Sequence, residues 1–199
     1  MYLWRRLNDE QRDKLLASRM ERRHPWHSPP HRESDRTDAY LFTAACYEHQ
    51  PHIGHSVERM QSFEECLLET VREQAREIVA WVVLPNHYHL LARTPSALAV
   101  LAALGTMHGR LSFEWNGAER QRGRQVWCRA AETAMKSERH YWATVNYIHH
   151  NPVKHRQVQK WQDWPFSSVH SFLAARGREE AMELWREYPV DEYGKGWDD

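Results

Sequence analysis

Two histidines separated by one residue, His87 and His89, are the side chains of this sequence best suited to bind a metal ion. They follow an eight-residue apolar run, residues 78–85, which predicts a buried strand ending in a Pro-Asn turn. The residues after the turn are then expected to form the returning strand of a hairpin. Because side chains alternate between the two faces of a strand, both imidazoles point one way and Tyr88 points the other. Two imidazoles side by side on one sheet face can hold a divalent metal ion.

A second pair of polar residues, Tyr147 and Asn151, lies in a predicted helix over residues 136–151. Positions four apart share one face of a helix, so the two side chains project together. An asparagine carbonyl oxygen is an acceptable ligand for magnesium or manganese, and a tyrosine hydroxyl can serve as a covalent nucleophile.

Together the two pairs predict chemistry on a phosphodiester. A metal ion on a non-bridging phosphate oxygen would withdraw charge and orient the group. The oxygen of Tyr147 could then attack phosphorus in line and displace a 3′-hydroxyl. The product would be a 5′-phosphotyrosine link that another 3′-hydroxyl can reverse, so joining strands would need no ATP.

Each pair also has a plainer explanation. Two alternating histidines on a strand are often exposed residues with no functional role, and Asn151 could simply end its helix before a proline. Among other candidate nucleophiles, Tyr88 faces away from the histidines and Tyr141 has an apolar residue four positions on. His149 and His150 could assist proton transfer, but helical geometry puts both off the face of the Tyr147 side chain.

The elements that would position these residues follow from hydrophobic periodicity and turn signals. We expect helices over residues 9–23, 57–77, from 96 onward, 136–151 and 168–176, and strands over 40–47, 78–84, 87–94 and 125–129. Without the first helix, this is the β-α-β-β-α-β order of an α+β, ferredoxin-like (RRM-like) antiparallel sheet with helices packed on one face. Its open face would carry the histidine pair. Residues 1–38 are expected to form an N-terminal helix and a Pro/His-rich extension, 39–176 the folded domain, and 177–199 an acidic tail.

The net charge of zero hides an uneven distribution. Residues 107–160 contain ten Lys and Arg against four Asp and Glu, a surplus that suits a phosphate backbone, although a solvated surface explains it equally well. No segment has the apolar length of a secretory signal or a membrane span. The three cysteines are widely spaced and form no zinc-finger pattern. We therefore expect a cytoplasmic protein with reduced thiols and no membrane partner.

Four segments resemble motifs of one enzyme family, the single-tyrosine HUH transposases (His, hydrophobic, His). Residues 84–91 (LPNHYHLL) resemble their HUH motif, 146–155 (NYIHHNPVKH) their nucleophile helix, 164–168 (WPFSS) their Trp-x-x-Ser-Ser segment, and 40–43 (YLFT) their first strand. The resemblance covers about residues 39–175 and is closest to the REP-associated tyrosine transposases. It implies an HUH endonuclease fold in which Tyr147 is the nucleophile. It also implies that His87, His89 and Asn151 bind Mg2+ or Mn2+.

The sequence departs from that family at two places. Arg156 and Gln157 stand where the closest relatives commonly have a glycine, which alters a loop rather than the chemistry. The Gly-rich N-terminal stretch by which relatives recognise a short sequence beside the DNA hairpin is missing, and residues 9–38 take its place. The resemblance therefore does not fix the DNA target.

The sequence as a whole predicts a metal-dependent transesterase that nicks and rejoins single-stranded DNA at hairpins. DNA contacts are expected from five basic residues: Arg120, Arg122, Arg124, Lys154 and Arg156. A non-cleaving, sequence-specific DNA-binding or regulatory protein on the same fold is the alternative. An RNA-binding sheet would instead need solvent-facing aromatic residues where His87 and His89 stand. A monomer is favoured, although the insertion-sequence relatives act as homodimers.

Overall fold

The computed structural model describes residues 8, 10–11, 13–14, 17–18 and 37–190 of the 199-residue chain. Most of the predicted helix over 9–23, the Pro/His-rich extension and the last nine residues lie outside the described residues. Within the described part, no helix combines the length and the apolar character that a membrane crossing requires.

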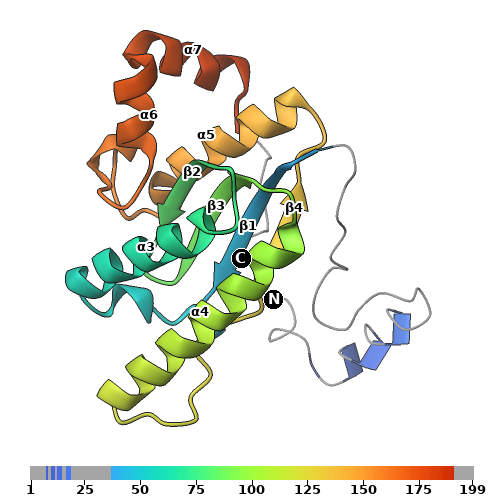
Figure 1. Cartoon of the computed structure of the whole chain (residues 1–199), viewed down its shortest axis with the longest axis vertical. Coiled ribbons are helices and arrows are strands. Elements are labelled where there is room, and N and C mark those ends of the chain that lie inside the picture. Colours follow the sequence, from blue (N-terminus) through green and yellow to red (C-terminus); the bar gives the residue numbers. More distant parts are fainter. Residues whose placement is uncertain (1–7, 9, 12, 15–16, 19–36, 191–199) are drawn as a thin grey trace.

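Four antiparallel strands form one sheet in the order β2-β3-β1-β4 (Figure 1). The strands are β1 (Ala39–Ala45), β2 (Glu77–Val83), β3 (His87–Arg93) and β4 (Ala131–Ala134). The helices are η1 (Tyr47–His49), η2 (Ile53–His55), α3 (Val57–Arg72), α4 (Ala97–Ala118), α5 (Glu138–Lys154), η3 (Trp161–Asp163), α6 (Val169–Arg176) and α7 (Arg178–Glu187). Helices α3 and α4 connect the strands in the β-α-β-β-α-β order, which confirms the predicted ferredoxin-like fold.

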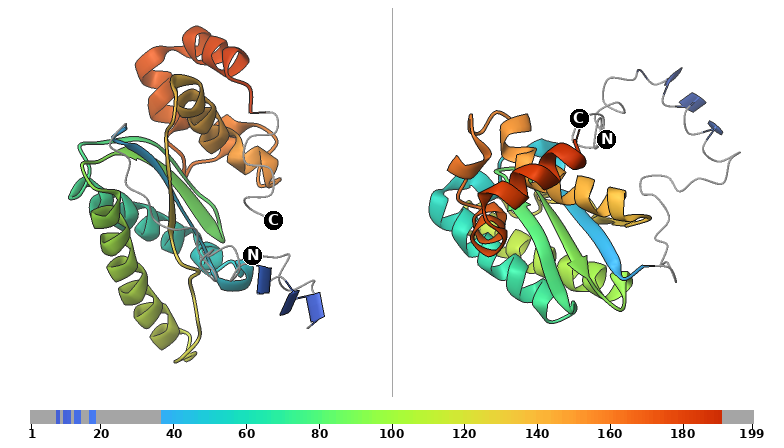
Figure 2. Two further views of the ribbon diagram at one scale, coloured as in Figure 1. Left: turned by 90° about the vertical axis from the view of Figure 1, so that its right-hand side faces the viewer. Right: turned by 90° about the horizontal axis from the view of Figure 1, so that it is seen from above.

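The two faces of the sheet are covered differently, as the left view of Figure 2 shows. Helices α3 and α4 pack on one face, over Phe42, Tyr88 and Leu90. Helix α5 packs on the other face, over Leu41 and Leu91, and α6 and α7 lie beyond it. Because side chains alternate along β3, His87 and His89 share the face of Leu91 and therefore lie under α5. The expectation that helices cover only one face and leave the histidine face open is therefore wrong.

The fourth strand lies later in the chain than the sequence indicated. The predicted strand over 125–129 is wrong, since this segment pairs with the sheet only through one isolated bridge between Cys46 and Trp127. The chain leaves β1 after Ala45 and turns into η1, so no further strand edge extends beside residues 125–129. Residues 131–134 instead pair with residues 40–43 of β1.

The helix that carries Tyr147 continues past its predicted end. Pro152 lies inside α5, and the helix ends at Lys154 rather than at Asn151. Proline has no N–H, so the Ile148 carbonyl loses its usual helical donor. The last turn still closes, because the N–H of His155 donates to the carbonyl of Asn151 at 3.0 Å.

Gly54, in η2, packs closely against Pro85 in the turn between β2 and β3. Its N–H donates to the Pro85 carbonyl at 2.9 Å, and a Cβ added to Gly54 would lie 2.4 Å from Pro85 Cβ. We expect Gly54→Ala to lower the free energy of unfolding by about 1–3 kcal/mol, the usual cost of overpacking a tight contact. Urea denaturation measures this change.

Gly105→Ala is the matched control for this substitution. A Cβ at Gly105, within α4, would meet no atom within 4 Å. Alanine favours helix by up to about 1 kcal/mol over glycine, so this variant should be unchanged or more stable. Equal destabilisation by both substitutions would show that the Pro85 contact is not the cause.

Candidate active site

The histidine pair lies at the start of β3, on the face that α5 covers. His87 and His89 are 2% and 0% exposed, and their ring centroids are 5.2 Å apart. The antiparallel register places His89 opposite Thr43 of β1 and His87 opposite Ala45. The sequence prediction that both imidazoles share one face is confirmed.

Neighbouring polar groups fix the orientation of both rings. Asn86 Nδ2 donates to the His49 carbonyl at 3.2 Å, which turns Asn86 Oδ1 towards His87 Nδ1 at 2.8 Å. An amide oxygen can only accept, so this network assigns the proton of His87 to Nδ1 and leaves Nε2 as an acceptor. On His89, Nδ1 forms a 2.8 Å hydrogen bond with the Thr43 hydroxyl, so its Nε2 also faces α5.

Tyr147 and Asn151 of α5 each contact one of the two histidines. The Tyr147 hydroxyl lies 3.4 Å from His89 Nε2, and Asn151 Oδ1 lies 3.2 Å from His87 Nε2. Both α5 side chains are buried, at 1% and 0% exposure. The four residues that the sequence singled out therefore converge on one buried point between β3 and α5, although the two contacting pairs are 58 and 64 positions apart in the chain.

The polar atoms at this point suit a cation. With His87 protonated on Nδ1, its Nε2 and the Asn151 Oδ1 are two acceptors that face each other, and Asn151 Nδ2 is buried without a hydrogen-bond partner among the described residues. A positive ion between such acceptors would satisfy them. No group of three or more His, Cys, Asp or Glu in the described part of the chain could hold a metal. A metal here would thus need the Asn151 amide beside the two imidazoles.

Two cationic or ionisable side chains from the end of α5 border the site. Lys154 Nζ lies 4.9 Å from the ring centroid of Tyr147, and the ring of His155 lies 4.7 Å from that of His87. His49 of η1 approaches His87 from the other side, with ring centroids 6.3 Å apart. No role for His155 or His49 was predicted from the sequence. His155 lies four residues after Asn151, and this spacing could have indicated that it belongs to the site. Nothing in the sequence indicated that His49 does.

The other basic residues predicted to contact DNA lie outside this cluster. Arg120, Arg122 and Arg124 follow the end of α4, and Arg156 follows the end of α5 with a φ of 55°. Arg124 is tied to its own loop, because it pairs with Glu119 at 2.8 Å and donates to Asn116 Oδ1 at 2.9 Å. Burial pushes the pKa of the Glu119 carboxyl upward, but hydrogen bonds from Arg124 and Arg59 outweigh it and lower that pKa to about 2.

The alternative nucleophile and the proton-transfer candidates lie away from the histidine pair. The Tyr88 hydroxyl points to the opposite face, 3.2 Å from His108 Nε2, and burial raises its pKa. His149 is buried against α6, with Nε2 3.2 Å from the Ser168 hydroxyl, and burial lowers its pKa to about 3. His150 Nδ1 bonds the carbonyl of Asn146 within α5.

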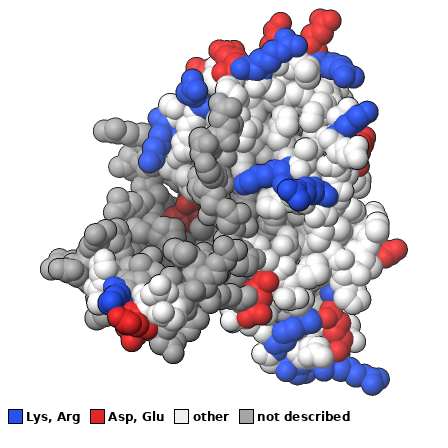
Figure 3. All heavy atoms as spheres, turned by 180° about the vertical axis from the view of Figure 1, so that it is seen from behind, with Lys and Arg blue, Asp and Glu red and all other residues white. Residues whose placement is uncertain are grey.

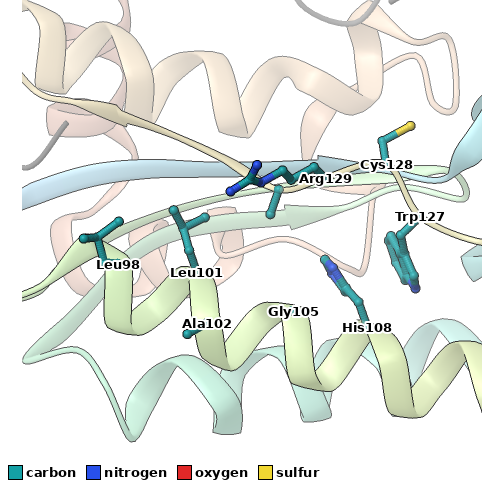
Figure 4. A pocket seen from close by; sticks show the side chains of 9 residues that line it. Leu98, Leu101, Ala102, Gly105, His108, Trp127, Cys128 and Arg129 are labelled. Atoms are coloured by element: carbon teal, nitrogen blue, oxygen red, sulfur yellow. The ribbon is translucent and has the colours of Figure 1, made fainter. Parts of the chain in front are cut away.

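A cavity of about 460 Å³ lies on the α4 face of the sheet, on the other side from the histidine pair (Figure 4). It is lined by α4 and by residues 127–130, with His108 and Trp127 stacked at one end at a centroid distance of 4.1 Å. The sheet separates this cavity from His87 and His89, so it forms no part of the candidate active site.

An antiparallel ferredoxin-like sheet that presents two alternating histidines to a helix-borne tyrosine and asparagine defines the HUH class of single-tyrosine DNA transposases. Comparison with known proteins identifies the family within this class. No family model matches the chain. A REP-associated tyrosine transposase of Escherichia coli K12 is 31% identical over 137 residues, which are 66% of this chain and 71% of that protein.

Two further comparisons agree. A Haemophilus influenzae protein assigned by name to the same group is 26% identical over 154 residues, 72% of this chain and 86% of its own length. A solved structure of a REP-associated tyrosine transposase bound to a REP hairpin superposes with a TM-score of 0.57 at 26% identity, covering 74% of this chain and 86% of that one. The chain belongs to the family of REP-associated tyrosine transposases, and it is an enzyme of the transposase class.

Proposed function

We propose that this protein nicks and rejoins single-stranded DNA at hairpins through a 5′-phosphotyrosine intermediate on Tyr147. One observation carries the proposal: a buried phenol and a buried carboxamide lie 3.4 and 3.2 Å from the Nε2 atoms of two adjacent imidazoles. A similar protein of known structure is bound to a REP hairpin, which supports hairpin DNA as the substrate class.

His87, His89 and Asn151 are the residues that would hold a divalent metal ion. When bound, magnesium or manganese would withdraw charge from a non-bridging phosphate oxygen and orient the phosphodiester. Asn86 and Thr43 keep both Nε2 atoms directed at that position through their bonds to the Nδ1 atoms. Lys154, with its ammonium near the Tyr147 ring, would attract the phosphate to the same place.

The proposed reaction exchanges one phosphoester bond for another. The Tyr147 oxygen attacks phosphorus, loses its proton and displaces the 3′-oxygen, which takes up a proton and leaves as a 3′-hydroxyl. Attack by a second 3′-hydroxyl reverses the step and releases the tyrosine. Because the Tyr147 side chain is 1% exposed, the buried surroundings disfavour hydrolysis of the intermediate by water.

All four proposed residues come from one chain, which supports a monomer that cuts without a residue from a second copy. Lys154 and Arg156 at the end of α5 are the proposed DNA contacts nearest the site. Arg120 and Arg122, after α4, would extend the contact with the phosphate backbone. The contacts of Arg124 with Glu119 and Asn116 favour a role in shaping its loop.

The adduct itself tests the proposal. Purified protein should be incubated with manganese and a hairpin oligonucleotide that has unpaired flanks, and then denatured in SDS. An oligonucleotide labelled at its 3′ end should give a labelled protein band, and one labelled at its 5′ end should release a free fragment. Label transfer from the 5′ end would contradict a 5′-phosphotyrosine link. Tight hairpin binding without any adduct would instead identify a non-cleaving DNA-binding protein.

The hydrogen bonds behind the imidazoles give a second prediction. Asn86→Ala and Thr43→Val should each weaken manganese binding about 10- to 100-fold, because each removes the group that orients one ring. Calorimetric titration of the protein with manganese measures the affinity without DNA. Gln61→Ala, on the exposed face of α3, is the control and should bind like the unaltered protein. Unchanged affinity in both variants would contradict the proposed ligands.

A further inference from the structure

The end of α4 and the loop after it, residues 110–124, form a projection that we call the basic arm. Figure 1 shows α4 running past the lower end of the sheet. One side of the arm packs on α3, where Trp115 contacts Phe63 and Glu119 pairs with Arg59. Figure 3 shows charged side chains gathered at this end, at the bottom of the view, with Lys and Arg outermost. The proposed reaction uses none of the arm's side chains directly.

An exposed aromatic ring lies on this arm. The Phe113 side chain is 68% exposed, the largest exposed fraction among the large hydrophobic residues of the described chain. The guanidinium of Arg122 stacks on its ring at 4.1 Å, and Arg122 Nη1 donates to the Phe113 carbonyl at 2.7 Å. Gly117 gives this guanidinium its space, because a Cβ there would lie 2.4 Å from Arg122 Nη2. The ring is therefore backed by a fixed cation and open to solvent.

The charges around the ring favour an anionic ligand. Glu119 is neutralised by Arg59 at 2.6 Å and by Arg124 at 2.8 Å, and Glu114 lies 3.4 Å from Arg110. Neither Arg120 nor Arg122 forms an ion pair with a carboxylate in the part of the chain that the structure describes. Arg122 beside the exposed ring, and Arg120 in the loop of the same arm, thus remain available for phosphates.

The arm is anchored at the end of the sheet that carries the candidate active site. Where the loop returns, the N–H of Tyr47 donates to the Val126 carbonyl at 2.7 Å. The neighbouring N–H of Cys46 donates to the Asn86 carbonyl, also at 2.7 Å, and Asn86 precedes His87. A DNA strand leaving the site at this end would pass towards the arm.

We propose that the basic arm is a second DNA-binding site, where one unpaired base stacks on Phe113 while Arg120 and Arg122 contact flanking phosphates. Stacking on an aromatic ring together with a positively charged surface is the usual way in which proteins bind single strands. The inference rests on the proposed function only in taking DNA with unpaired nucleotides as the ligand. It assigns Phe113 to binding and not to cleavage.

Photo-crosslinking tests the contact directly. A hairpin oligonucleotide with unpaired flanks should carry 5-iodouracil at one unpaired position at a time, because this base crosslinks to a stacked aromatic side chain. Trypsin cuts after Arg110 and Arg120, so Phe113 lies in the peptide of residues 111–120. At one or more positions the crosslink should map to this peptide, with fragment masses that assign it to Phe113 rather than to the buried Trp115.

Substitutions give the energetic test. Phe113→Leu keeps an apolar, helix-compatible side chain but removes the ring, and should lose the crosslink and weaken hairpin binding at least about five-fold. Arg122→Gln should weaken binding and lower the dependence of log K on log salt by about 0.7. Arg178→Gln, an exposed residue of α7, is the charge-matched control and should change neither.

The outcomes separate this inference from the proposed cleavage. A crosslink to Phe113 that persists in Tyr147→Phe supports DNA binding by the basic arm, whether or not the unaltered protein forms an adduct. If Phe113→Leu forms the adduct and binds DNA with unchanged affinity, the proposed DNA contact of the basic arm is wrong and the proposed cleavage stands. A change in sedimentation of Phe113→Leu without any change in DNA binding would also overturn it, because the ring would then serve protein association.

Discussion

Tyr147→Phe will abolish the covalent protein–DNA adduct, by at least about 1000-fold, while leaving hairpin binding within about two-fold. The substitution removes only the hydroxyl oxygen, which lies 3.4 Å from His89 Nε2, and keeps the buried ring on α5. Loss of one such hydrogen bond costs about 1 kcal/mol of stability, so the variant should fold. Adduct yield on a 3′-labelled hairpin and DNA affinity by fluorescence anisotropy measure the two effects.

Tyr141→Phe is the control from the same helix. Tyr141 lies two turns earlier on α5 and packs against Arg93, whose guanidinium is 5.3 Å from the ring centroid. Tyr141→Phe removes the same hydroxyl group as Tyr147→Phe but leaves the surroundings of the histidine pair unchanged. This variant should form adduct at the normal rate. An adduct that survives Tyr147→Phe would place the nucleophile elsewhere in the chain.

Sequence reasoning succeeded where one local rule determined the geometry. Alternation along a strand was enough to put His87 and His89 on one face, and helical spacing was enough to pair Tyr147 with Asn151. Their meeting across the two elements could not come from periodicity. It depends on α5 crossing the face of β2 and β3, which the order of elements permits but does not require.

The wrong predictions came from local signals that tertiary contacts override. The apolar residues near Trp127 suggested a strand, but they serve the core beneath α4, where Trp127 stacks on His108. Pro152 suggested the end of a helix, yet it lies within the last turn of α5, two residues before the final residue Lys154, where few carbonyls still need a helical donor. The longer helix is what brings Lys154 and His155 to the site.

The predicted acidic segment over 177–199 contains a helix that the sequence did not indicate. Residues 178–187 form α7, which packs on α5, and Asn146 Nδ2 donates to the carbonyls of Leu184 and Tyr188 at 3.1 and 2.7 Å. The excess of acidic residues did not indicate this helix, because composition does not show a partner for the few apolar residues of the segment. The contact holds the residue next to Tyr147, so the segment helps to fix α5, which carries the proposed nucleophile.

His87→Ala and His89→Ala will each remove the stabilisation that manganese gives to the folded protein. A ligand at 100 times its dissociation constant stabilises the native state by about 2.7 kcal/mol, and this should appear as a rise in Tm for the unaltered protein. Removing either imidazole deletes one of three proposed ligands, so the affinity should fall at least about 100-fold and the stabilisation at the same manganese concentration should fall to about 0.4 kcal/mol or less. Thermal unfolding with and without manganese measures the shift.

Each variant is compared with itself, so a loss of basal stability does not obscure the result. His89 is fully buried and bonded to Thr43, and its removal leaves a void and an unpaired hydroxyl, which lowers Tm even without metal. The prediction concerns only the difference that manganese makes. His170→Ala, an exposed histidine of α6, should keep the full shift. If both active-site variants kept it too, the metal would have to bind elsewhere, and the imidazole pair would have to act on the phosphate without it.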